Sequence, residues 1–399
     1  MSKSTNRIIN AQALDTLGLA DDLIAHGTKG AYINTYTSSG LLYHVDFTSL
    51  NGHTQYPYGL IVSQYSTERV LEKKIEEMGI RVERSYRLVR LSDEDEDGLI
   101  VATFDNGEKM KAKYIVGADG ARSSVRQLLN IGFADPDGAA IDDKGVVQMV
   151  IADVTFTSPP PHSAPQQFDM QTAGSKMSLA IPIPRSRYPE SYESKEDGIF
   201  RIGFSIPKED GPPPSSLDAD FFQRCLDSRR PQFMCSGKGK EDMVKIDKVF
   251  WSSRFRTHAA IADKFLVRLH AQNQNQNLNP RVVFLVGDAA HIHSPMGGQG
   301  MNLGIRDAIG LGPLLVKHME QFPQDSSAAD KLLEEYASVR YERAISTIRL
   351  TKRSMRLVAT FGAMANGWAR CLMWLVELFF KIPFVTGAMA WELSGLGRV

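Results

Sequence analysis

Residues 281–307 read Arg281-Val-Val-Phe-Leu-Val-Gly-Asp-Ala-Ala-His-Ile-His-Ser-Pro-Met-Gly-Gly-Gln-Gly-Met-Asn-Leu-Gly-Ile-Arg-Asp307, and this stretch decides the fold. It begins with the apolar run Val282 to Val286, which is short and β-branched, as expected of a strand buried on both faces. Gly287 and Asp288 end that strand with a turn and a carboxylate. Ligands of open α/β sheets bind at the carboxyl ends of the strands. The stretch therefore predicts a ligand near Asp288.

A glycine-rich loop and a helix follow the strand. Gly297, Gly298 and Gly300 allow the backbone to approach a flat or charged group closely, and the pattern becomes helical from about Met301. The free N–H groups in the first turn of that helix, together with the positive end of its dipole, favour negative charge. We expect a ligand with hydroxyls near Asp288 and negative charge near the helix start. A tight packing turn is the alternative, because this pattern alone is a weak signal.

Two further stretches of the sequence help to interpret this strand–loop–helix pattern. Tyr114–Arg126 is a strand followed by Gly-Asp-Gly and a helix that opens on Ser123 or Ser124, and Gln64–Leu71 begins an amphipathic helix. In this order and spacing, the three stretches resemble the flavoprotein aromatic hydroxylases, which are FAD-dependent monooxygenases similar to p-hydroxybenzoate hydroxylase and phenol hydroxylase. The resemblance extends over about residues 7–349.

The resemblance implies an α/β fold. It consists of a glutathione-reductase-like FAD-binding domain, truncated at its N-terminus, with an inserted β-sheet substrate domain and a C-terminal helical region. The implied FAD-binding segments are 1–28, 63–134 and 256–325, the substrate-domain segments are 29–62 and 135–255, and the C-terminal helices occupy 326–399.

The family normally begins with a strand, a Gly-x-Gly-x-x-Gly turn and a helix that hold the FAD pyrophosphate. This sequence contains no such unit, and Arg7–Gly27 resembles the helix that follows it in the family. We therefore expect the chain to start inside the FAD-binding domain, either because the gene model lacks its first exon or because the natural protein is truncated. The main anchor for the ADP half of the cofactor is then missing.

The resemblance also assigns residues to the cofactor. Asp288 is expected to bind the ribityl hydroxyls, and the amides around residues 300–302 are expected to stabilise the reduced ring near N1 and O2. Pro295 is expected to shape the flavin C4a side, and no catalytic base is assigned, although His291 and Tyr36 are candidates. The expected cofactor-binding residues are Gln64, Asp119, Gly120, Arg126, Gly287, Asp288, Pro295, Gly298, Gly300, Met301 and Asn302.

The second motif has two interpretations. Asp119 at a strand end can accept hydroxyl protons, and Arg122 or Arg126 can pair with a phosphate. The alternative is an ordinary helix cap with surface arginines.

The implied reaction uses FAD, with NAD(P)H as reductant and dioxygen as oxidant. It inserts oxygen into a small hydrophobic substrate, aromatic or polyketide-like, through a flavin C4a-hydroperoxide. A truncated, non-catalytic remnant of the fold and an isoprenoid epoxidase or reductase are the alternatives. The sequence does not choose between hydroxylation, epoxidation and Baeyer–Villiger insertion.

Composition restricts the other function classes. The chain has 399 residues, of which 43% are hydrophobic, and this length favours two domains. Its 46 basic side chains balance 46 acidic ones, which argues against nucleic acid as a partner. Its three cysteines have no metal-ligand spacing, and the His291-x-His293 pair lacks a carboxylate or cysteine cluster, so no metal site is expected. The polar N-terminus lacks a signal-peptide core, which favours a cytoplasmic protein.

The rest of the sequence predicts several strands and an apolar C-terminal segment. Arg81–Val89 reads as a strand, and 147–156, 177–183 and 199–206 read as strands of a substrate-covering sheet. The apolar segment 371–391 is interrupted by Glu377, Lys381 and Pro383, so it is not a clean membrane span. We expect it to dock on the FAD-binding domain, with a peripheral membrane contact as the minority alternative.

Overall fold

The structure is a computed structural model, and it divides into two compact units. The first unit comprises Met1–Met78, Val147–Thr257 and Arg353–Val399, and the second comprises Gly79–Val146 and His258–Lys352. The structure describes residues 6–9, 11–37, 40–92, 98–138, 147–161, 167–173, 176–183, 198–236, 243–269, 280–293, 299–363, 376 and 378–394.

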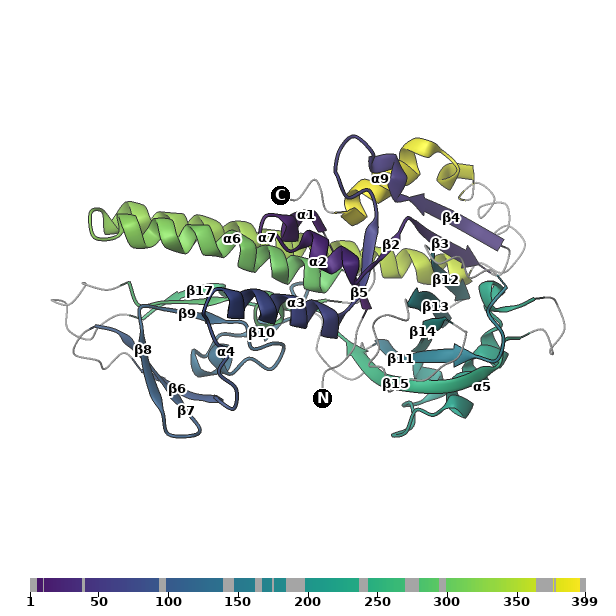
Figure 1. The fold of residues 1–399 in the computed structure, drawn as a ribbon, viewed down its shortest axis with the longest axis horizontal. Coiled ribbons are helices and arrows are strands. Elements are labelled where there is room, and N and C mark those ends of the chain that lie inside the picture. The colour runs from purple at the N-terminus through teal and green to yellow at the C-terminus, as the bar shows by residue number, and fades with distance from the viewer. Residues whose placement is uncertain are drawn as a thin grey trace. The chain divides into compact units, whose positions relative to one another are not determined.

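A seven-stranded sheet dominates the first unit (Figure 1). Its strands, in spatial order, are β15 (Ile246–Thr257), β11 (Val147–Phe156), β14 (Ile199–Ile206), β13 (Lys176–Ile183), β12 (Gln167–Ala173), β3 (Tyr32–Thr37) and β4 (Gly40–Asp46). Neighbouring strands are antiparallel, except that β12 and β3 are parallel. The strands expected at 147–156, 177–183 and 199–206 are confirmed.

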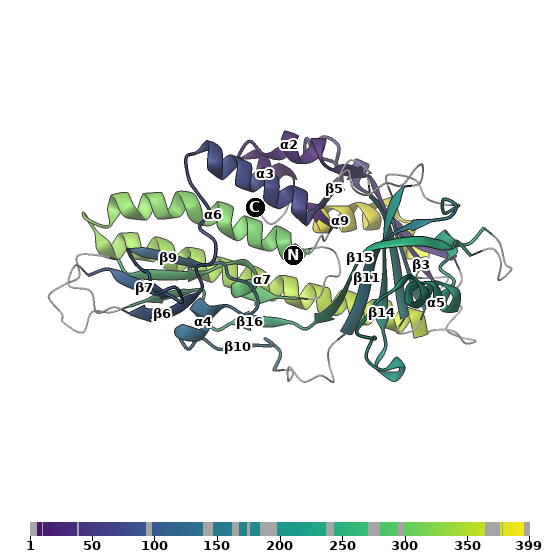
Figure 2. The same cartoon turned by 60° about the horizontal axis from the view of Figure 1, so that its bottom comes forward.

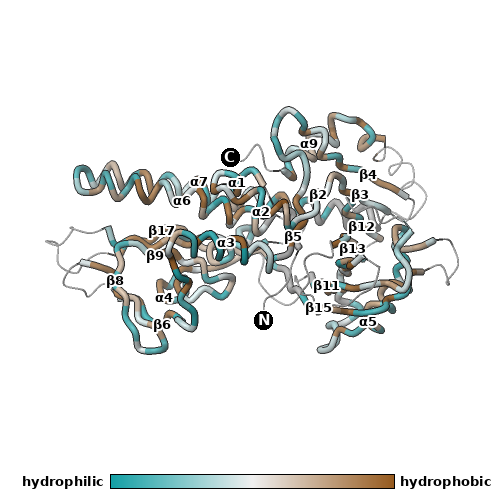
Figure 3. The backbone as a smooth tube through the Cα atoms, in the orientation of Figure 1, coloured by the Kyte–Doolittle hydropathy of each residue, from teal (hydrophilic) through white to brown (hydrophobic). Residues whose placement is uncertain are grey.

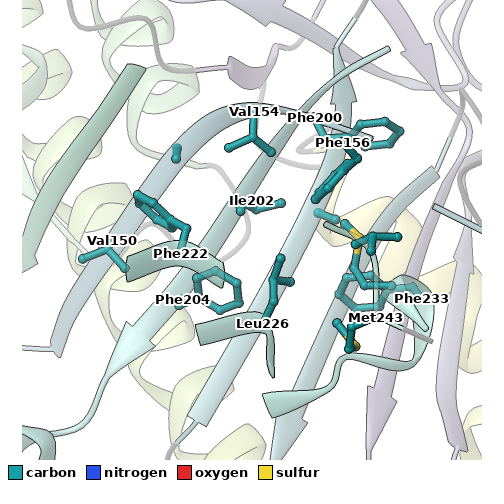
Figure 4. Packing of buried hydrophobic residues seen from close by; sticks show 14 of the residues in the cluster. Val150, Val154, Phe156, Phe200, Ile202, Phe204, Phe222, Leu226, Phe233 and Met243 are labelled. Atoms are coloured by element: carbon teal, nitrogen blue, oxygen red, sulfur yellow. The ribbon is translucent and has the colours of Figure 1, made fainter. Parts of the chain in front are cut away.

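One face of this sheet packs against helix α5 (Ala219–Arg229) and the 3-10 turn η4 (Gln232–Met234). Alternate residues of the strands, such as Val150, Ile202 and Phe204, meet Phe222 and Leu226 of the helix in one apolar cluster (Figure 4). All five side chains are at most 1% exposed, as the two-residue period of a strand predicts for its core face. A second short turn, η3 (Lys208–Asp210), precedes the helix.

The N-terminal part of the first unit differs from the expectation. Arg7–Gly27 was expected to be one helix, but it forms a strand and two short helices. Strand β1 (Asn6–Ile9) pairs with β5 (Gly59–Ser63), which also pairs with β2 (Thr28–Gly30). The helices are α1 (Ala11–Asp15) and α2 (Ala20–Ala25), and Gly18 between them has a φ of +66°, which ends α1. Helix α3 (Gln64–Glu77) follows β5 as expected.

The second unit is built around a three-stranded sheet in which β18 is central. Strand β18 (Val282–Leu285) is parallel to β9 (Tyr114–Gly117) and antiparallel to β17 (Leu266–Arg268). Val282 and Phe284 face one apolar cluster, and Val283 and Leu285 face the other, so the strand is buried on both faces as expected. Figure 3 shows the hydrophobic residues gathered along β9 and β17 in brown.

Two small antiparallel sheets complete this unit. One is β6 (Leu88–Ser92), β7 (Ile100–Phe104) and β8 (Lys109–Ala112), and the other is β10 (Phe133–Ala134), β16 (Ala260–Ala262) and β19 (His291–Ile292). The strand expected at Arg81–Val89 is wrong for most of its length, because only its last two residues belong to β6. Ile80 and Val82 are about half exposed, so this segment does not bury its apolar side chains.

Two long helices flank the central sheet, and both views show them side by side (Figures 1 and 2). They are α6 (Gln299–Gln321) and α7 (Ser326–Ala363), of which residues 353–363 belong to the first unit. Leu311 of α6 and Leu333 of α7 pack on the face of β18 that carries Phe284. The short helix α4 (Ser124–Leu128) opens after Ser123, as expected.

The C-terminal segment docks at a place other than the expected one. Helix α9 (Pro383–Ser394) belongs to the first unit, where its buried Ala390 packs with Val45 of β4 and with Phe47 and Leu50 of the 3-10 turn η1 (Phe47–Leu50). The expectation that it docks on the FAD-binding segments is therefore wrong, because the strand and turn that cover it lie within the predicted substrate-domain segment 29–62.

Residues 371–375 and 377 lie outside the described residues, and Phe379 and Phe384 are 53% and 83% exposed. A membrane contact of this segment stays a prediction. Among the described helices, none is long and apolar enough to cross a bilayer.

Candidate functional site

The two aspartate motifs follow neighbouring parallel strands. The register aligns Val282 with Tyr114 and Leu285 with Gly117, and the N–H of Val286 continues the ladder by donating to the carbonyl of Gly117 at 3.0 Å. Parallel strands end at the same edge of a sheet. The turns that carry Asp119 and Asp288 therefore leave the sheet at one edge.

The Asp288 side chain is exposed at this edge. It sits in the 3-10 turn η6 (Gly287–Ala289), which begins with Gly287 at a φ of +58°. A residue with a Cβ rarely adopts this backbone conformation. Within the described part of the chain, nothing hydrogen-bonds to the Asp288 carboxylate. Both carboxylate oxygens are therefore available as acceptors for the hydroxyls of a ligand.

Helix α6 begins after the loop that follows this turn. Gly300 is half-buried, and among the described residues the atom nearest to a Cβ added there lies 3.9 Å away, in the ring of His293. Met301 is half-buried and Asn302 is 7% exposed. The first turn of α6 thus has backbone N–H groups without intrahelical acceptors and little side-chain cover at Gly300.

Asp119 is exposed, and one of its oxygens already has a partner. Its Oδ2 accepts a hydrogen bond of 3.1 Å from the backbone N–H of Val125, while Oγ of Ser123 accepts the N–H of Arg126 at 3.0 Å. The two side chains together satisfy N–H groups at the start of α4. The next glycine, Gly120, has a φ of +82° and open space around it. The helix-cap interpretation of the motif is thus present in the structure, and Oδ1 of Asp119 stays available to a ligand.

Arg126 lies inside the protein and joins the two motifs. Its Nη1 donates to the carbonyl of Ala289 and its Nη2 to the carbonyl of Ala121, both at 2.7 Å. The guanidinium also lies 3.7 Å from the centroid of the Phe133 ring, and burial lowers the pKa of Arg126. Only 5% of the residue is exposed. Through these hydrogen bonds Arg126 connects the two turns. A direct contact of Arg126 with a phosphate stays a prediction.

The described part of the second unit does not include three of the expected residues. Pro295 and Gly298 lie outside the described residues. Gln64 belongs to the first unit, where it opens α3 and donates from Nε2 to Oε1 of Glu68 at 2.6 Å. Their contacts with the cofactor stay predictions.

The two candidate bases have other surroundings. His291 is 2% exposed, and its Nε2 lies 2.7 Å from Oδ2 of Asp307. Tyr36 belongs to the first unit, where its ring packs 5.9 Å from that of Phe233. Burial, with the charge of Asp169 adding to it, raises the pKa of Tyr36, which opposes the role of a base at neutral pH.

No role was predicted for Asp307, the last residue of the stretch 281–307. Its position in the sequence indicates that its side chain is buried. Asp307 lies four residues after Leu303 and four before Leu311, and both leucines are buried. A carboxylate on the apolar stripe of a helix is buried and needs a buried partner.

The geometry of this edge fits one half of the expected cofactor. An exposed carboxylate that has no partner among the described residues suits the ribityl hydroxyls. The start of a 23-residue helix suits a ring that becomes negatively charged on reduction. The sequence contains no Gly-x-Gly-x-x-Gly turn for the pyrophosphate, so the fit covers the flavin ring and ribityl chain.

Comparisons with known proteins show the family to which the chain belongs. The family described as FAD binding domain matches residues 9–224 and 256–351. Rifampicin monooxygenase of Streptomyces venezuelae is 31% identical over 307 residues, which are 77% of this chain and 54% of that protein. The chain spans 54% to 62% of the length of the first three curated relatives that it matches.

Solved structures share the fold. p-Nitrophenol 4-monooxygenase from Pseudomonas putida superposes with a TM-score of 0.71 at 18% identity, covering 99% of this chain and 89% of the other. Anhydrotetracycline hydroxylase from Streptomyces rimosus gives 0.65 at 25% identity and covers 99% and 68%. These matches confirm the α/β FAD-binding fold class with a substrate sheet and C-terminal helices. The chain belongs to the FAD binding domain family, the aromatic-hydroxylase-like flavoproteins that its two aspartate motifs resemble.

Proposed function

We propose that this chain is the FAD- and substrate-binding part of a flavin-dependent monooxygenase. The proposed substrate is hydrophobic, either aromatic or polyketide-like. Relatives named as monooxygenases of rifampicin, anhydrotetracycline and p-nitrophenol support this choice of substrate class. NAD(P)H is proposed as the reductant. The family match supports FAD as the cofactor, and a flavin-dependent monooxygenase needs an electron donor that reduces this FAD.

The observation that carries the proposal is the state of Asp288. The carboxylate stands at the end of a strand buried on both faces, in a turn joined to the second aspartate motif through Arg126. It is exposed and, among the described residues, has no hydrogen-bond partner. A carboxylate with a purely structural role would be capped or paired, as Asp119 and Asp307 are.

The protein's own residues would hold the cofactor, while the cofactor supplies the oxygen chemistry. Bound FAD, once reduced, activates dioxygen and delivers one oxygen atom to the substrate. Asp288 would accept hydroxyl hydrogen bonds from the ribityl chain and thereby set the position of the ring. The backbone N–H groups of Gly300, Met301 and Asn302 would stabilise negative charge on the ring.

The test compares FAD binding by wild type and by Asp288→Ala, measured by the change of flavin fluorescence on titration. We expect the variant to bind FAD more weakly by roughly tenfold or more, the size expected when a hydrogen bond to a charged group is lost. Because Asp288 is exposed and has no partner among the described residues, its urea unfolding midpoint should stay that of the wild type. Asp220→Ala removes an exposed aspartate from the first turn of α5 and is the matched control.

The result also separates the alternatives. Wild-type protein that stays colourless after incubation with FAD contradicts the proposal and supports the non-catalytic remnant. Protein that turns yellow should then oxidise NAD(P)H faster when a suitable aromatic substrate is added. Product analysis distinguishes hydroxylation from double-bond reduction, which is the reaction of the reductase alternative.

A further inference from the structure

A buried carboxylate that the proposed reaction does not use lies directly behind the Asp288 turn. Asp307 is on α6 and is 2% exposed. Its Oδ2 accepts a hydrogen bond from the backbone N–H of Gly287 at 3.2 Å and contacts Nε2 of His291 at 2.7 Å. A carboxylate has no donor, so Nε2 carries the proton in this contact. One oxygen atom therefore holds both ends of the segment 287–291.

Helix α7 holds the same aspartate from its other side. The hydroxyl of Tyr336 donates to the backbone carbonyl of Asp307 at 2.6 Å, and Nε of Arg340 lies 3.9 Å from Oδ1. Burial, with the charge of Asp307 adding to it, raises the pKa of Tyr336, so this hydroxyl keeps its proton at neutral pH. Asp307 is thus fixed within its own unit by α7 as well as by the turn.

A backbone contact sets the distance between α6 and the turn. A Cβ added at Gly304 would lie 3.1 Å from Cα of Gly287, tighter than ordinary van der Waals contact. Gly304 precedes Asp307 by three residues, so both contacts lie on one face of the helix. The turn is therefore held to α6 by a close approach of the backbones and by hydrogen bonds to one carboxylate.

We infer that Asp307, together with His291, is a positioning residue for the flavin. It fixes the Gly287–Ala289 turn against α6, so that the Asp288 carboxylate and the first-turn amides of α6 keep a constant separation. The inference rests on the proposed FAD site, in which these two groups bind different parts of one rigid ligand. Because both contacts depend on that separation, loosening the turn weakens both.

The first experiment requires no cofactor. Hydrogen exchange of the Gly287 amide is measured in wild type, in Asp307→Leu, which removes the acceptor, and in Asp307→Asn, whose side-chain oxygen can still accept both hydrogen bonds. Asp330→Leu is the matched control. Asp330 of α7 contacts the buried His318 near the end of α6 at 3.2 Å and pairs with Arg268 at 2.6 Å, so its loss disturbs another His–Asp pair of the same unit.

We expect the Gly287 amide to exchange at least about tenfold faster in Asp307→Leu, because a hydrogen bond to a charged group is lost. In Asp307→Asn and Asp330→Leu its rate should stay close to that of wild type. Equal exchange in wild type and Asp307→Leu overturns the inference. Equal acceleration in Asp307→Leu and Asp330→Leu also overturns it, because the effect would then be general destabilisation.

The second experiment measures FAD affinity and the visible circular dichroism of the bound flavin. Asp307→Leu should bind FAD roughly tenfold or more weakly and change the flavin signal, whereas Asp307→Asn should restore both. Gly304→Ala keeps every polar group and should show the same direction, which protects the test if Asp307→Leu fails to fold. Unchanged affinity and signal in both Asp307→Leu and Gly304→Ala overturn the positioning role. Wild type that binds no FAD contradicts the proposed function instead, and hydrogen exchange still decides whether Asp307 holds the turn.

Discussion

Arg126 donates a hydrogen bond of 2.7 Å to the carbonyl of Ala289, the residue that follows Asp288. The two partners are 163 residues apart in the sequence. With its second hydrogen bond, to the carbonyl of Ala121, this guanidinium joins the turns of both aspartate motifs. The arginine of one motif therefore determines the geometry of the other.

Replacing Arg126 with methionine should destabilise the protein even without cofactor. The change leaves the carbonyls of Ala289 and Ala121 without their buried donor, which should lower the free energy of unfolding by about 1–3 kcal/mol. Urea unfolding of the cofactor-free protein measures this. Arg122→Met, at an exposed arginine of the same motif, is the control and should change little. If Arg126 acts only by contacting a phosphate, Arg126→Met loses FAD affinity while its stability stays that of wild type.

Replacing Gly117 with alanine should also destabilise the second unit. The added Cβ would lie 2.9 Å from Cδ2 of Leu285 and 2.9 Å from Cβ of Val125, both in the packed core. Overpacking of this kind costs about 1–3 kcal/mol. Gly387→Ala is the matched control, because Gly387 lies in α9 and no atom of the described residues is within 4 Å of the added Cβ. That change should be neutral or stabilising by up to about 1 kcal/mol. Thermal unfolding compares the two, and equal midpoints would contradict the packing argument.

The buried ion pair of the seven-stranded sheet should be sensitive to the loss of one partner. Arg201 donates to both carboxylate oxygens of Asp153, at 2.6 and 2.7 Å, and the two side chains are 2% and 0% exposed. Arg201→Met removes the cation that pairs with this buried aspartate, which should cost about 3–5 kcal/mol in urea unfolding. Combining it with Asp153→Leu should recover part of the loss.

An exposed pair is the control for this prediction. Lys73 and Glu77 are 3.7 Å apart with 69% and 53% of their side chains exposed. Lys73→Met should change stability by less than about 1 kcal/mol. If Arg201→Met lowers the free energy of unfolding no more than Lys73→Met does, the argument that burial makes the loss of one partner costly is wrong.

The ion cluster between Lys352 and the loop after β10 should make stability depend on pH. Lys352 donates to Asp135 at 2.6 Å and to Asp137 at 2.8 Å. The hydrogen bond from Lys352 lowers the pKa of Asp137 below its ordinary 3.8. Burial opposes the charge on Lys352, but the hydrogen bonds that it donates to both aspartates outweigh burial and raise the pKa of Lys352 above 10.5.

The sign of the effect follows from these two shifts. The Asp137 contribution is complete above about pH 3.8 and is lost as the pH falls through its lower folded-state pKa. The Lys352 contribution is complete below 10.5 and is lost as the pH rises through its higher folded-state pKa. Lys352→Met should therefore be less stable than wild type between these limits, with the difference shrinking outside them. Urea unfolding at several pH values measures it, and a difference that does not vary with pH would contradict the electrostatic cause.

Local patterns in the sequence predicted the parts of the fold that depend on local chemistry. The apolar run before Gly287 gave a doubly buried strand, and Ser123 was recognised as the start of α4. The sequence predicted both strands and the turns that follow them, but the parallel pairing of β9 with β18 is a finding of the structure. Where local apolar residues do not find a partner, as at Ile80 and Val82, the same reasoning predicted a strand that does not form.

Contacts between distant segments were not predictable in this way. The sequence marks Arg126 as a cation near an anion-binding turn, but nothing local shows that its guanidinium donates to two carbonyl groups. One of these, the carbonyl of Ala289, lies in the distant Asp288 motif. Asp307 is similar, since its place between Leu303 and Leu311 shows that it is buried without showing its partners. The docking of α9 depends on the shape of the surface around Val45 and Phe47, which a hydropathy pattern does not contain.

The turn Gly287–Ala289 is tied at its first N–H to Asp307 and at its last carbonyl to Arg126. An inserted or deleted residue between these two anchors would break at least one of them and rotate the carboxylate away from the sheet edge. The number of residues in the turn is thus as constrained as their identity. Relatives that differ in substrate should vary here by substitution alone, and diversity in loop length should be confined to other parts of the chain.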